Sequence, residues 1–239
     1  MLNFVASFLC GFFGWCEPTQ CGPRDFEKAN YYVCRFNVAD IEVNNHLHNG
    51  AGEPYGYLTH LAKGIKKPPL MLMNGGMYHD DLSPVGLYVE AGRKFSNVST
   101  KGGWGNFHLL PNGIFWGVDG KLGVTETKKF IRQKQKVDFA TQSGPMLVID
   151  GRLHPRFLEN SQSQKIRNGV GVSKDGKRIY FAISRRPVTF WQFGKLFQTK
   201  LKAHNALFLD GTVSAIQAGD YAQSGWRALG PMISVVGRD

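Results

Sequence analysis

Four Asp-Gly pairs, each at the end of a short apolar run, constrain the fold of this chain more than any other feature of its sequence. After the pairs at Asp119, Asp150 and Asp175, a second apolar or alternating run follows at once, which is typical of a β-hairpin. The fourth pair begins at Asp210, and residues 212–216 after it are compatible with a fourth hairpin. The sequence therefore predicts a largely antiparallel β-sheet.

Helical periodicity is confined to two short segments. Residues 55–63 and 190–203 carry apolar side chains at a spacing close to that of a helix. The chain has no internal repeat, no Ser/Gly-rich linker and no change of composition after residue 22, and 42% hydrophobic residues suffice for a sizeable core. We therefore expect the α+β class, with a mixed, largely antiparallel β-sheet and a few short helices, in a single domain over residues 21–239.

The first sixteen residues carry no charge, and residues 4–15 have the length and apolar character of a signal-peptide core. A buried N-terminal strand or helix is the alternative, because the segment has no early Lys or Arg and no clear cleavage site. We interpret residues 1–20 as a signal peptide and expect an exported protein, periplasmic or extracellular. No later apolar run approaches the ~20 residues that span a bilayer, so we expect no integral membrane segment in the mature chain.

Cysteine and histidine spacing gives no support for a metal. Removal of a signal peptide would leave Cys21 and Cys34, which are close enough in sequence to form a disulfide. No C-x-x-C spacing occurs, and His46 and His48 have no further Cys or His pair at a ligand-like distance. No loop is rich in the oxygen ligands of Mg²⁺ or Ca²⁺. We therefore expect no cofactor, and a divalent metal, which a carboxylate beside a phosphate site can hold, has no support in the sequence.

The chain is strongly basic, since 29 Lys and Arg residues against 18 Asp and Glu give a net charge of +11. This indicates an anionic partner, such as an anionic polysaccharide or a phosphate-bearing envelope polymer. The most basic segment, residues 128–136, is not interleaved with several aromatic residues, and no nucleic-acid-binding module is recognisable. We interpret the segment as a solvated surface and expect no nucleic acid partner.

The chain has no G-x-S-x-G elbow, P-loop, dinucleotide-binding glycine fingerprint or H-E-x-x-H motif. Polar residues lie instead in glycine-containing strings that flank the predicted strands. Glycine lets backbone N–H groups approach a ligand closely, as an anion site requires. We predict that one cleft at the strand ends is lined by two amides, a guanidinium and a carboxylate, from Asn74, Gln142, Arg167 and Asp210.

Three of these residues also have a simpler interpretation. Asp210 could be an ordinary turn aspartate, Asn74 could hold a tight turn, and Arg167 could form a surface salt bridge. His79, with the two acidic residues after it, could be an acid–base cluster or an exposed loop, and we favour the loop.

In their order along the chain, the glycine-containing strings resemble the motifs of the phosphodiester glycosidase family. The resemblance covers residues 34–239, and the strings at 140–146 and 167–172 look like those of a bacterial exported subgroup. The matching strings are N-G-G-M-Y from residue 74, P-V-G-L from residue 84, G-P-M-L-V-I-D-G from residue 144, R-N-G-V-G from residue 167 and L-D-G from residue 209.

The resemblance implies a hydrolase that removes a sugar from a sugar-phosphate diester in an anionic glycan or glycolipid. It implies Asp210 as nucleophile or general base, Arg167 as phosphate clamp, and Asn74 as a third catalytic residue that orients sugar or phosphate oxygens. The backbone amides of Gly75 and Gly76 would line the anion site. Further substrate-binding positions would be Tyr78, His79, Gln142, Ser143, Gly144, Asn168, Gly211 and Ser214.

The chain departs from the family at one place. Where the family reads L-D-G-G-G-S, this sequence reads L-D-G-T-V-S, with Thr212 and Val213 before Ser214. Two β-branched side chains reduce the room beside Asp210. The alternative function is therefore a catalytically silent envelope glycan-binding protein that keeps the pocket without turnover.

Overall fold

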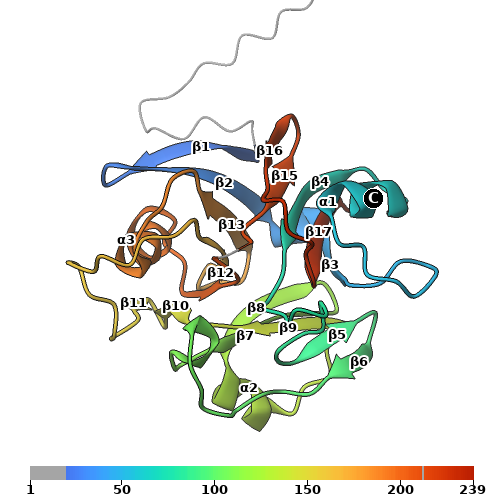
Figure 1. Ribbon diagram of the computed structural model, residues 1–239, viewed down its shortest axis with the longest axis horizontal. Helices are drawn as coiled ribbons and strands as arrows, with labels where there is room; N and C mark the ends of the chain where they lie inside the picture. Colours follow the sequence, from blue (N-terminus) through green and yellow to red (C-terminus); the bar gives the residue numbers. More distant parts are fainter. Residues whose placement is uncertain (1–19, 212) are drawn as a thin grey trace, which may run out of the picture.

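The computed structural model describes residues 20–211 and 213–239, which form three β-sheets and three short α-helices (Figure 1). Every strand pair within these residues is antiparallel, which confirms the predicted α+β class. Sheet A has the order β1 (Cys21–Phe26), β2 (Ala29–Asn37), β13 (Arg178–Ser184), β12 (Asn168–Val172), β14 (Asn205–Phe208), β10 (Met146–Ile149) and β11 (Arg152–Leu153).

The other two sheets have five strands each. Sheet B has the order β16 (Tyr221–Gln223), β15 (Ile216–Ala218), β4 (Pro69–Asn74), β17 (Met232–Gly237) and β3 (Ile41–His46). Sheet C has the order β6 (Arg93–Ser96), β5 (Tyr88–Glu90), β9 (Phe139–Ser143), β7 (Gly113–Val118) and β8 (Lys121–Glu126). The helices are α1 (Leu58–Gly64), α2 (Thr127–Gln133) and α3 (Phe190–Lys195), which continues as a π-helical turn, η3 (Leu196–Lys200); 3₁₀ turns are η1 (Val38–Asp40) and η2 (Asn106–His108).

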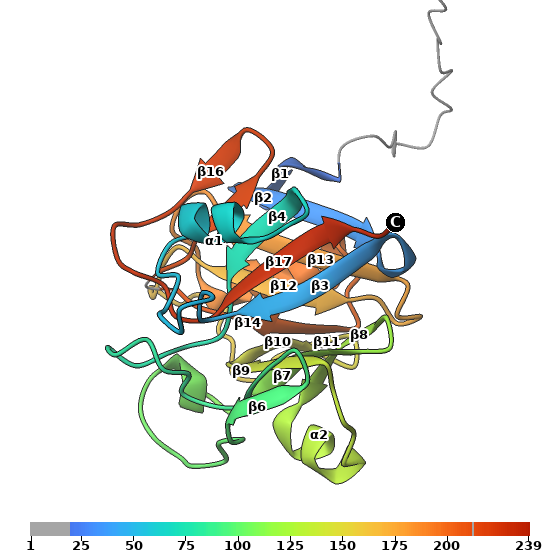
Figure 2. The same ribbon diagram turned by 90° about the vertical axis from the view of Figure 1, so that its right-hand side faces the viewer.

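The three sheets enclose one apolar core. Side chains from β2, β12 and β13 of sheet A meet side chains from β4 and β17 of sheet B and from β7, β8 and β9 of sheet C. Each helix covers a different sheet, with α3 on sheet A (Figure 1), and with α1 on sheet B and α2 on sheet C (Figure 2). Strand ends from different sheets therefore come together around the core.

The three predicted Asp-Gly hairpins are confirmed. They join β7 to β8, β10 to β11, and β12 to β13, and each strand pair is antiparallel. Asp119 and Asp150 have φ angles of 48° and 47°, and the glycine after each also has a positive φ. This backbone geometry is that of a two-residue hairpin turn, for which Asp-Gly is a favoured sequence.

The fourth Asp-Gly pair does not form a hairpin. Strand β14 lies in sheet A between β12 and β10, whereas β15 lies in sheet B between β4 and β16. Residues 209–215 therefore pass from one sheet to the other, and we call this segment the crossover. Asp210 lies on the crossover, so the simpler interpretation of this residue as a hairpin-turn aspartate is wrong.

Both predicted helical segments are helical, as α1 and as α3 with η3. Helix α2 was missed by the periodicity because most of its residues are polar or cationic, and only Thr127 and Phe130 are buried. It begins where the side chain of Glu126 accepts hydrogen bonds from the backbone N–H groups of Lys128 and Lys129, which caps its first turn. The cationic residues of the segment 128–136 are exposed, as predicted for a solvated surface.

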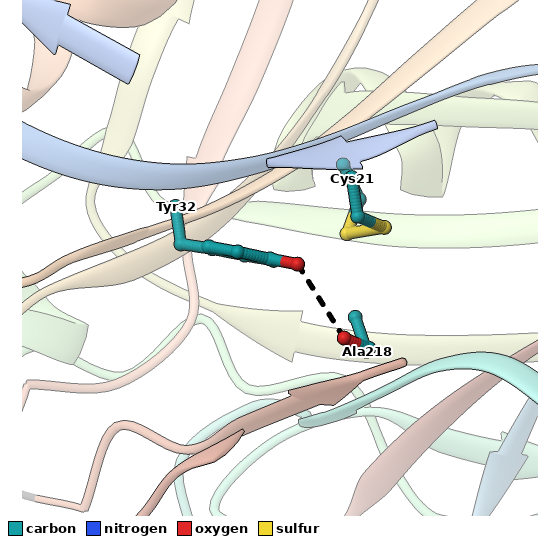
Figure 3. The surroundings of a disulfide bond; sticks show 4 residues. Cys21, Tyr32 and Ala218 are labelled. Atoms are coloured by element: carbon teal, nitrogen blue, oxygen red, sulfur yellow. Dashed lines mark hydrogen bonds between the residues drawn. A yellow bond between two sulfur atoms is a disulfide. The ribbon is translucent and has the colours of Figure 1, made fainter. Parts of the chain in front are cut away.

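Cys21 and Cys34 form the predicted disulfide (Figure 3). They lie opposite each other in the antiparallel register of β1 and β2. Nearby on β2, the hydroxyl of Tyr32 donates to the carbonyl oxygen of Ala218 at 3.4 Å, which links sheet A to sheet B. The predicted signal peptide lies, apart from its last residue, outside the described residues. Within the described residues, no helix combines the length and the apolarity needed to cross a membrane.

The disulfide should contribute measurably to stability. It links residues separated by 13 positions, so Cys21→Ala with Cys34→Ala should lower the free energy of unfolding by roughly 2–4 kcal/mol. Urea unfolding of the oxidised protein and of the double variant measures the difference. Coincident unfolding midpoints with equal slopes would contradict this expectation.

Candidate active site

The backbone around Asp210 is held by three buried polar side chains. The N–H of Asp210 donates to Oδ1 of Asn168 at 2.9 Å, and its carbonyl oxygen accepts from Oγ of Ser214 at 2.7 Å. One residue earlier, the carbonyl oxygen of Leu209 accepts from Oγ of Ser143 at 2.6 Å. Each of the three partners is less than a tenth exposed. These bonds hold the backbone of Asp210 and of the residue before it. They therefore fix the point from which the aspartate side chain extends.

A pair of buried asparagines supports this arrangement. Asn74 is the last residue of β4 in sheet B, and Asn168 is the first residue of β12 in sheet A. Oδ1 of Asn74 accepts from Nδ2 of Asn168 at 2.5 Å and from the backbone N–H of Ala215 at 2.8 Å. Since Asn168 in turn binds Asp210, the pair holds both ends of the crossover. Asn74 is 1% exposed, so its position fits a positioning role rather than contact with a substrate.

Asp210 lines a cleft of about 990 Å³, a volume at the upper end of the range for small-molecule sites. Residues from five segments of the chain contribute to it, and three of them are predicted site residues: Asp210, Tyr78 and His79. The remaining lining residues are Tyr57, Met77, Asp80, Leu82, Val85, Trp104, Gly105, Asn106, Phe107, His108, Val213, Trp226, Arg227 and Ala228.

Charges of both signs act on Tyr78 in this cleft. Its hydroxyl donates to the carbonyl oxygen of Ala228 at 2.8 Å. Burial raises the pKa of Tyr78, the negative charge of Asp210 raises this pKa further, and the positive charge of Arg227 lowers it. The carboxylate and the guanidinium therefore both lie near this ring, and the phenol remains neutral at physiological pH.

His79 and Asp80 line the cleft from an exposed turn. The N–H of His79 donates to the carbonyl oxygen of Ser83 at 2.8 Å, and Asp81 accepts from the N–H of Ser83 at 2.9 Å. This confirms the exposed-loop interpretation and leaves His79 and Asp80 within reach of a ligand. In the part of the chain that the structure describes, no three His, Cys, Asp or Glu side chains form a candidate metal site.

Gln142 does not line the cleft, so the predicted role of its amide in orienting the substrate is not supported. Its Oε1 accepts from the N–H groups of Leu87 and Ser99 at 3.0 and 2.9 Å, and its Nε2 donates to the carbonyl oxygen of Ser99 at 2.7 Å. The side chain is 1% exposed. Neighbours along a strand face opposite sides, and Ser143 is the residue on the Asp210 side. Gln142 therefore anchors the loop after β6.

Arg167 also does not line the cleft, which contradicts its predicted place there. Its side chain is 1% exposed, and Nε and one Nη donate to the carbonyl oxygens of Val188 and Ser163 at 2.9 and 3.1 Å. The guanidinium carbon lies 3.5 Å from the ring centroid of Phe190. Burial lowers the pKa of Arg167 to about 10, and the group remains charged at neutral pH. Arg167 is therefore a core residue whose guanidinium packs on Phe190 of α3, and the interpretation as a surface salt bridge is wrong.

The amides of Gly75 and Gly76 are used within the protein, contrary to the prediction of an anion site. The N–H of Gly75 donates to the carbonyl oxygen of Pro231 at 2.6 Å, and the N–H of Gly76 donates to Oγ1 of Thr141 at 3.1 Å. A side chain at Gly76 would collide with the backbone of β9, so this glycine permits sheets B and C to approach closely. The other predicted glycines that do not line the cleft are Gly144 and Gly211.

Sequence reasoning missed most residues of the cleft, among them two tryptophans and an arginine. Trp104 lies between β6 and β7, and Trp226 and Arg227 lie between β16 and β17. These segments hold neither a predicted strand nor a family motif, so no spacing marked them. The available signal was an isolated Trp beside glycine in each polar segment, K-G-G-W-G-N and S-G-W-R.

The family model for phosphodiester glycosidases matches residues 70–234, a span that includes Asn74, Asn168 and Asp210. This chain therefore belongs to the phosphodiester glycosidase family. It is also 38% identical over 180 residues to the uncharacterized protein YigE of Escherichia coli, a match that covers 74% of this chain and 70% of YigE.

Two solved structures share the fold. The catalytic domain of zebrafish N-acetylglucosamine-1-phosphodiester α-N-acetylglucosaminidase matches with a TM-score of 0.62 at 17% identity, over 91% of this chain and 82% of that one. A Burkholderia pseudomallei protein described as exported matches with a TM-score of 0.57 at 10% identity, over 87% of this chain and 74% of that one. At these identities the likeness concerns the fold alone.

The asparagine pair should be essential to the stability of the site. Asn74→Leu would leave Nδ2 of Asn168 and the N–H of Ala215 buried without this acceptor, so it should lower the free energy of unfolding by roughly 2–4 kcal/mol. Asn44→Leu on strand β3 of the same sheet is the matched control, because Asn44 is exposed. Urea unfolding measures both variants, and losses of equal size would contradict the role given to the pair.

Proposed function

We propose that this chain hydrolyses sugar-phosphate diesters in an anionic glycan or glycolipid, with Asp210 acting at the anomeric carbon. One observation carries the proposal: Asp210, which is 9% exposed and whose backbone is held by Asn168, lines the same cleft as Arg227. Membership of the phosphodiester glycosidase family supports the same chemistry. The net charge of +11 suits a substrate that carries phosphate.

The leaving group explains why one carboxylate is sufficient. The bond between the anomeric carbon and the phosphate oxygen breaks, and the phosphate departs with the bonding electrons as a phosphomonoester. Water supplies the hydroxyl that ends on the sugar, and Asp210 acts as its base or as a nucleophile whose sugar ester water then cleaves. An ordinary glycoside needs a second carboxylate to protonate its leaving oxygen, whereas phosphate is weakly basic and depends less on that proton.

Arg227 takes the phosphate-clamp role that sequence analysis assigned to Arg167. A guanidinium beside the departing phosphate offsets the negative charge that develops there, and it binds phosphate through paired N–H donors. Arg227 lines the cleft, so it can approach a phosphate directly, whereas Arg167 is enclosed by the core.

Val213 supports altered selectivity at this site. It is one of the two residues that replace family glycines, and it lines the cleft together with Asp210. Its side chain packs with Leu58 and Leu61 of α1, and a ligand in the cleft must fit beside it. We expect the site to accept smaller groups beside Asp210 than a glycine-lined site would. The same substitution favours the rival function, a glycan-binding protein of this fold without turnover.

Export to the periplasm or the extracellular space is part of the proposal. The uncharged apolar N-terminal stretch and the disulfide between Cys21 and Cys34 support it, since disulfides persist in oxidising compartments. An exported protein would meet phosphate-bearing glycans of the cell envelope.

A panel of sugar-1-phosphodiesters, assayed for released sugar and phosphomonoester, tests the activity. Asp210→Asn should lower kcat by ~10³-fold or more, because an amide neither accepts the proton nor attacks the sugar. Arg227→Gln should raise KM and lower kcat, because it contacts the phosphate in the ground state and in the transition state. Arg186→Gln is the matched control, since Arg186 is exposed and does not line the cleft.

Two outcomes would overturn parts of this account. If Arg167→Gln raises KM in a folded protein and Arg227→Gln does not, the clamp is Arg167. If the native protein binds the diesters without hydrolysing any, and Asp210→Asn binds them equally well, the protein is a glycan-binding relative of the enzymes.

A further inference from the structure

The two most exposed large apolar side chains in the described residues line the same cleft. Trp104 is 98% exposed and Trp226 is 82% exposed. They come from segments that are far apart in sequence, and Tyr57 adds a third, partly exposed aromatic ring to the cleft. A tryptophan left in water forgoes a large burial free energy, and exposed apolar side chains that gather in one place mark binding surfaces.

The segment that carries Trp104 is anchored on both sides of the indole. On one side, Gln142 binds the N–H and the carbonyl oxygen of Ser99. On the other side, Nδ1 of His108 lies 3.0 Å from the carbonyl oxygen of Lys101. The backbone on both sides of Trp104 is therefore tied to the rest of the protein, while the indole remains in solvent.

The segment that carries Trp226 is anchored just after the indole. Tyr78 donates to the carbonyl oxygen of Ala228, and the N–H of Leu229 donates to the carbonyl oxygen of Gly56 at 2.7 Å. The guanidinium carbon of Arg227 lies 5.1 Å from the centroid of the Trp226 ring. A ligand that stacks on Trp226 would therefore lie next to the proposed phosphate clamp.

We propose that Trp104 and Trp226 bind pyranose rings of the glycan chain that bears the scissile phosphodiester, so the substrate is an oligosaccharide or polysaccharide. This inference rests on the proposed function and names the substrate class of the same site. The C–H groups on one face of a pyranose are positively polarised and pack on the electron-rich face of an indole, while the sugar hydroxyls stay in water. A cleft of about 990 Å³ leaves room for more than the sugar at Asp210.

The surroundings of the indoles favour a glycan over a membrane surface. Interfacial binding to a bilayer uses apolar side chains together with cations. Here the two tryptophans share a concave cleft with Asp80, Asp210 and His79 as well as with Arg227. The carboxylates of Asp80 and Asp210 suit the hydroxyl groups of sugars, and Arg227 is the group for the phosphate. This mixture of charges fits a phosphate-bearing glycan better than a surface of anionic lipid headgroups.

Calorimetric titration of the full chain with neutral tetrasaccharides tests the inference without requiring turnover. We use maltotetraose, cellotetraose and chitotetraose, and expect at least one of them to bind and to change the tryptophan fluorescence. Trp104→Ala and Trp226→Ala should each weaken its binding about tenfold. Replacement of either residue by Phe should restore part of the affinity, because a smaller aromatic face remains. Leu158→Ala is the control, since Leu158 is 65% exposed and lies outside the cleft lining.

The inference is overturned if no tetrasaccharide binds at millimolar concentration, or if the two Trp→Ala variants bind as well as the native protein. It is also overturned if vesicles of phosphatidylglycerol and phosphatidylcholine bind the protein through these tryptophans while the tetrasaccharides do not. Tryptophan-dependent binding by a protein that cleaves no diester would support the glycan subsite and refute the proposed activity, so the two failures are distinguishable.

Discussion

The hydrogen bond from the amide of Asn168 to the amide of Asn74 is the interaction on which the site depends. It joins the end of β4 in sheet B to the start of β12 in sheet A, in a place where neither side chain meets water. Two further bonds of these amides reach Asp210 on one side of the crossover and Ala215 on the other. A buried amide that loses its partner carries a large desolvation cost, so the pair tolerates little variation in the path of the crossover.

Sheet C completes this arrangement through Ser143 at the end of β9, which binds the carbonyl oxygen of Leu209. Sheets A, B and C thus provide Asn168, Asn74 and Ser143, respectively. Asn168 binds the backbone of Asp210, Asn74 binds Asn168, and Ser143 binds the residue before Asp210. The consequence is a carboxylate whose backbone cannot move without breaking contacts to all three sheets. Such preorganisation is what an electrostatic or nucleophilic group needs in order to stabilise a transition state more than a ground state.

The sequence predicted the hairpins because the signal for a tight turn is local. Sequence motifs also singled out Asn74, Ser143, Asn168 and Ser214, which all lie around Asp210. They were predicted as catalytic or substrate-binding residues, whereas the structure shows their side chains bonded within the protein. The fourth Asp-Gly pair looked the same in sequence, and only the pairing of β15 with β4 showed that it begins a crossover. That pairing joins strands far apart in the chain, and no local pattern specifies it.

The errors at Gln142 and Arg167 have a common physical cause. Each is the immediate neighbour of a residue that supports Asp210, and adjacent residues of an extended chain face opposite sides of the sheet. A motif locates the strand end without fixing which of two neighbours faces the site. Arg227 and the two tryptophans lie in segments without regular structure, where folding of the whole chain decides what meets the cleft.

A crystal structure of the Asp210→Asn protein with the best sugar-1-phosphodiester from the activity panel tests the central claim most directly. The account predicts the anomeric carbon beside residue 210 and the phosphate against the Arg227 guanidinium. A phosphate bound by Arg167, or a sugar held in the cleft with its anomeric carbon turned away from residue 210, would contradict it.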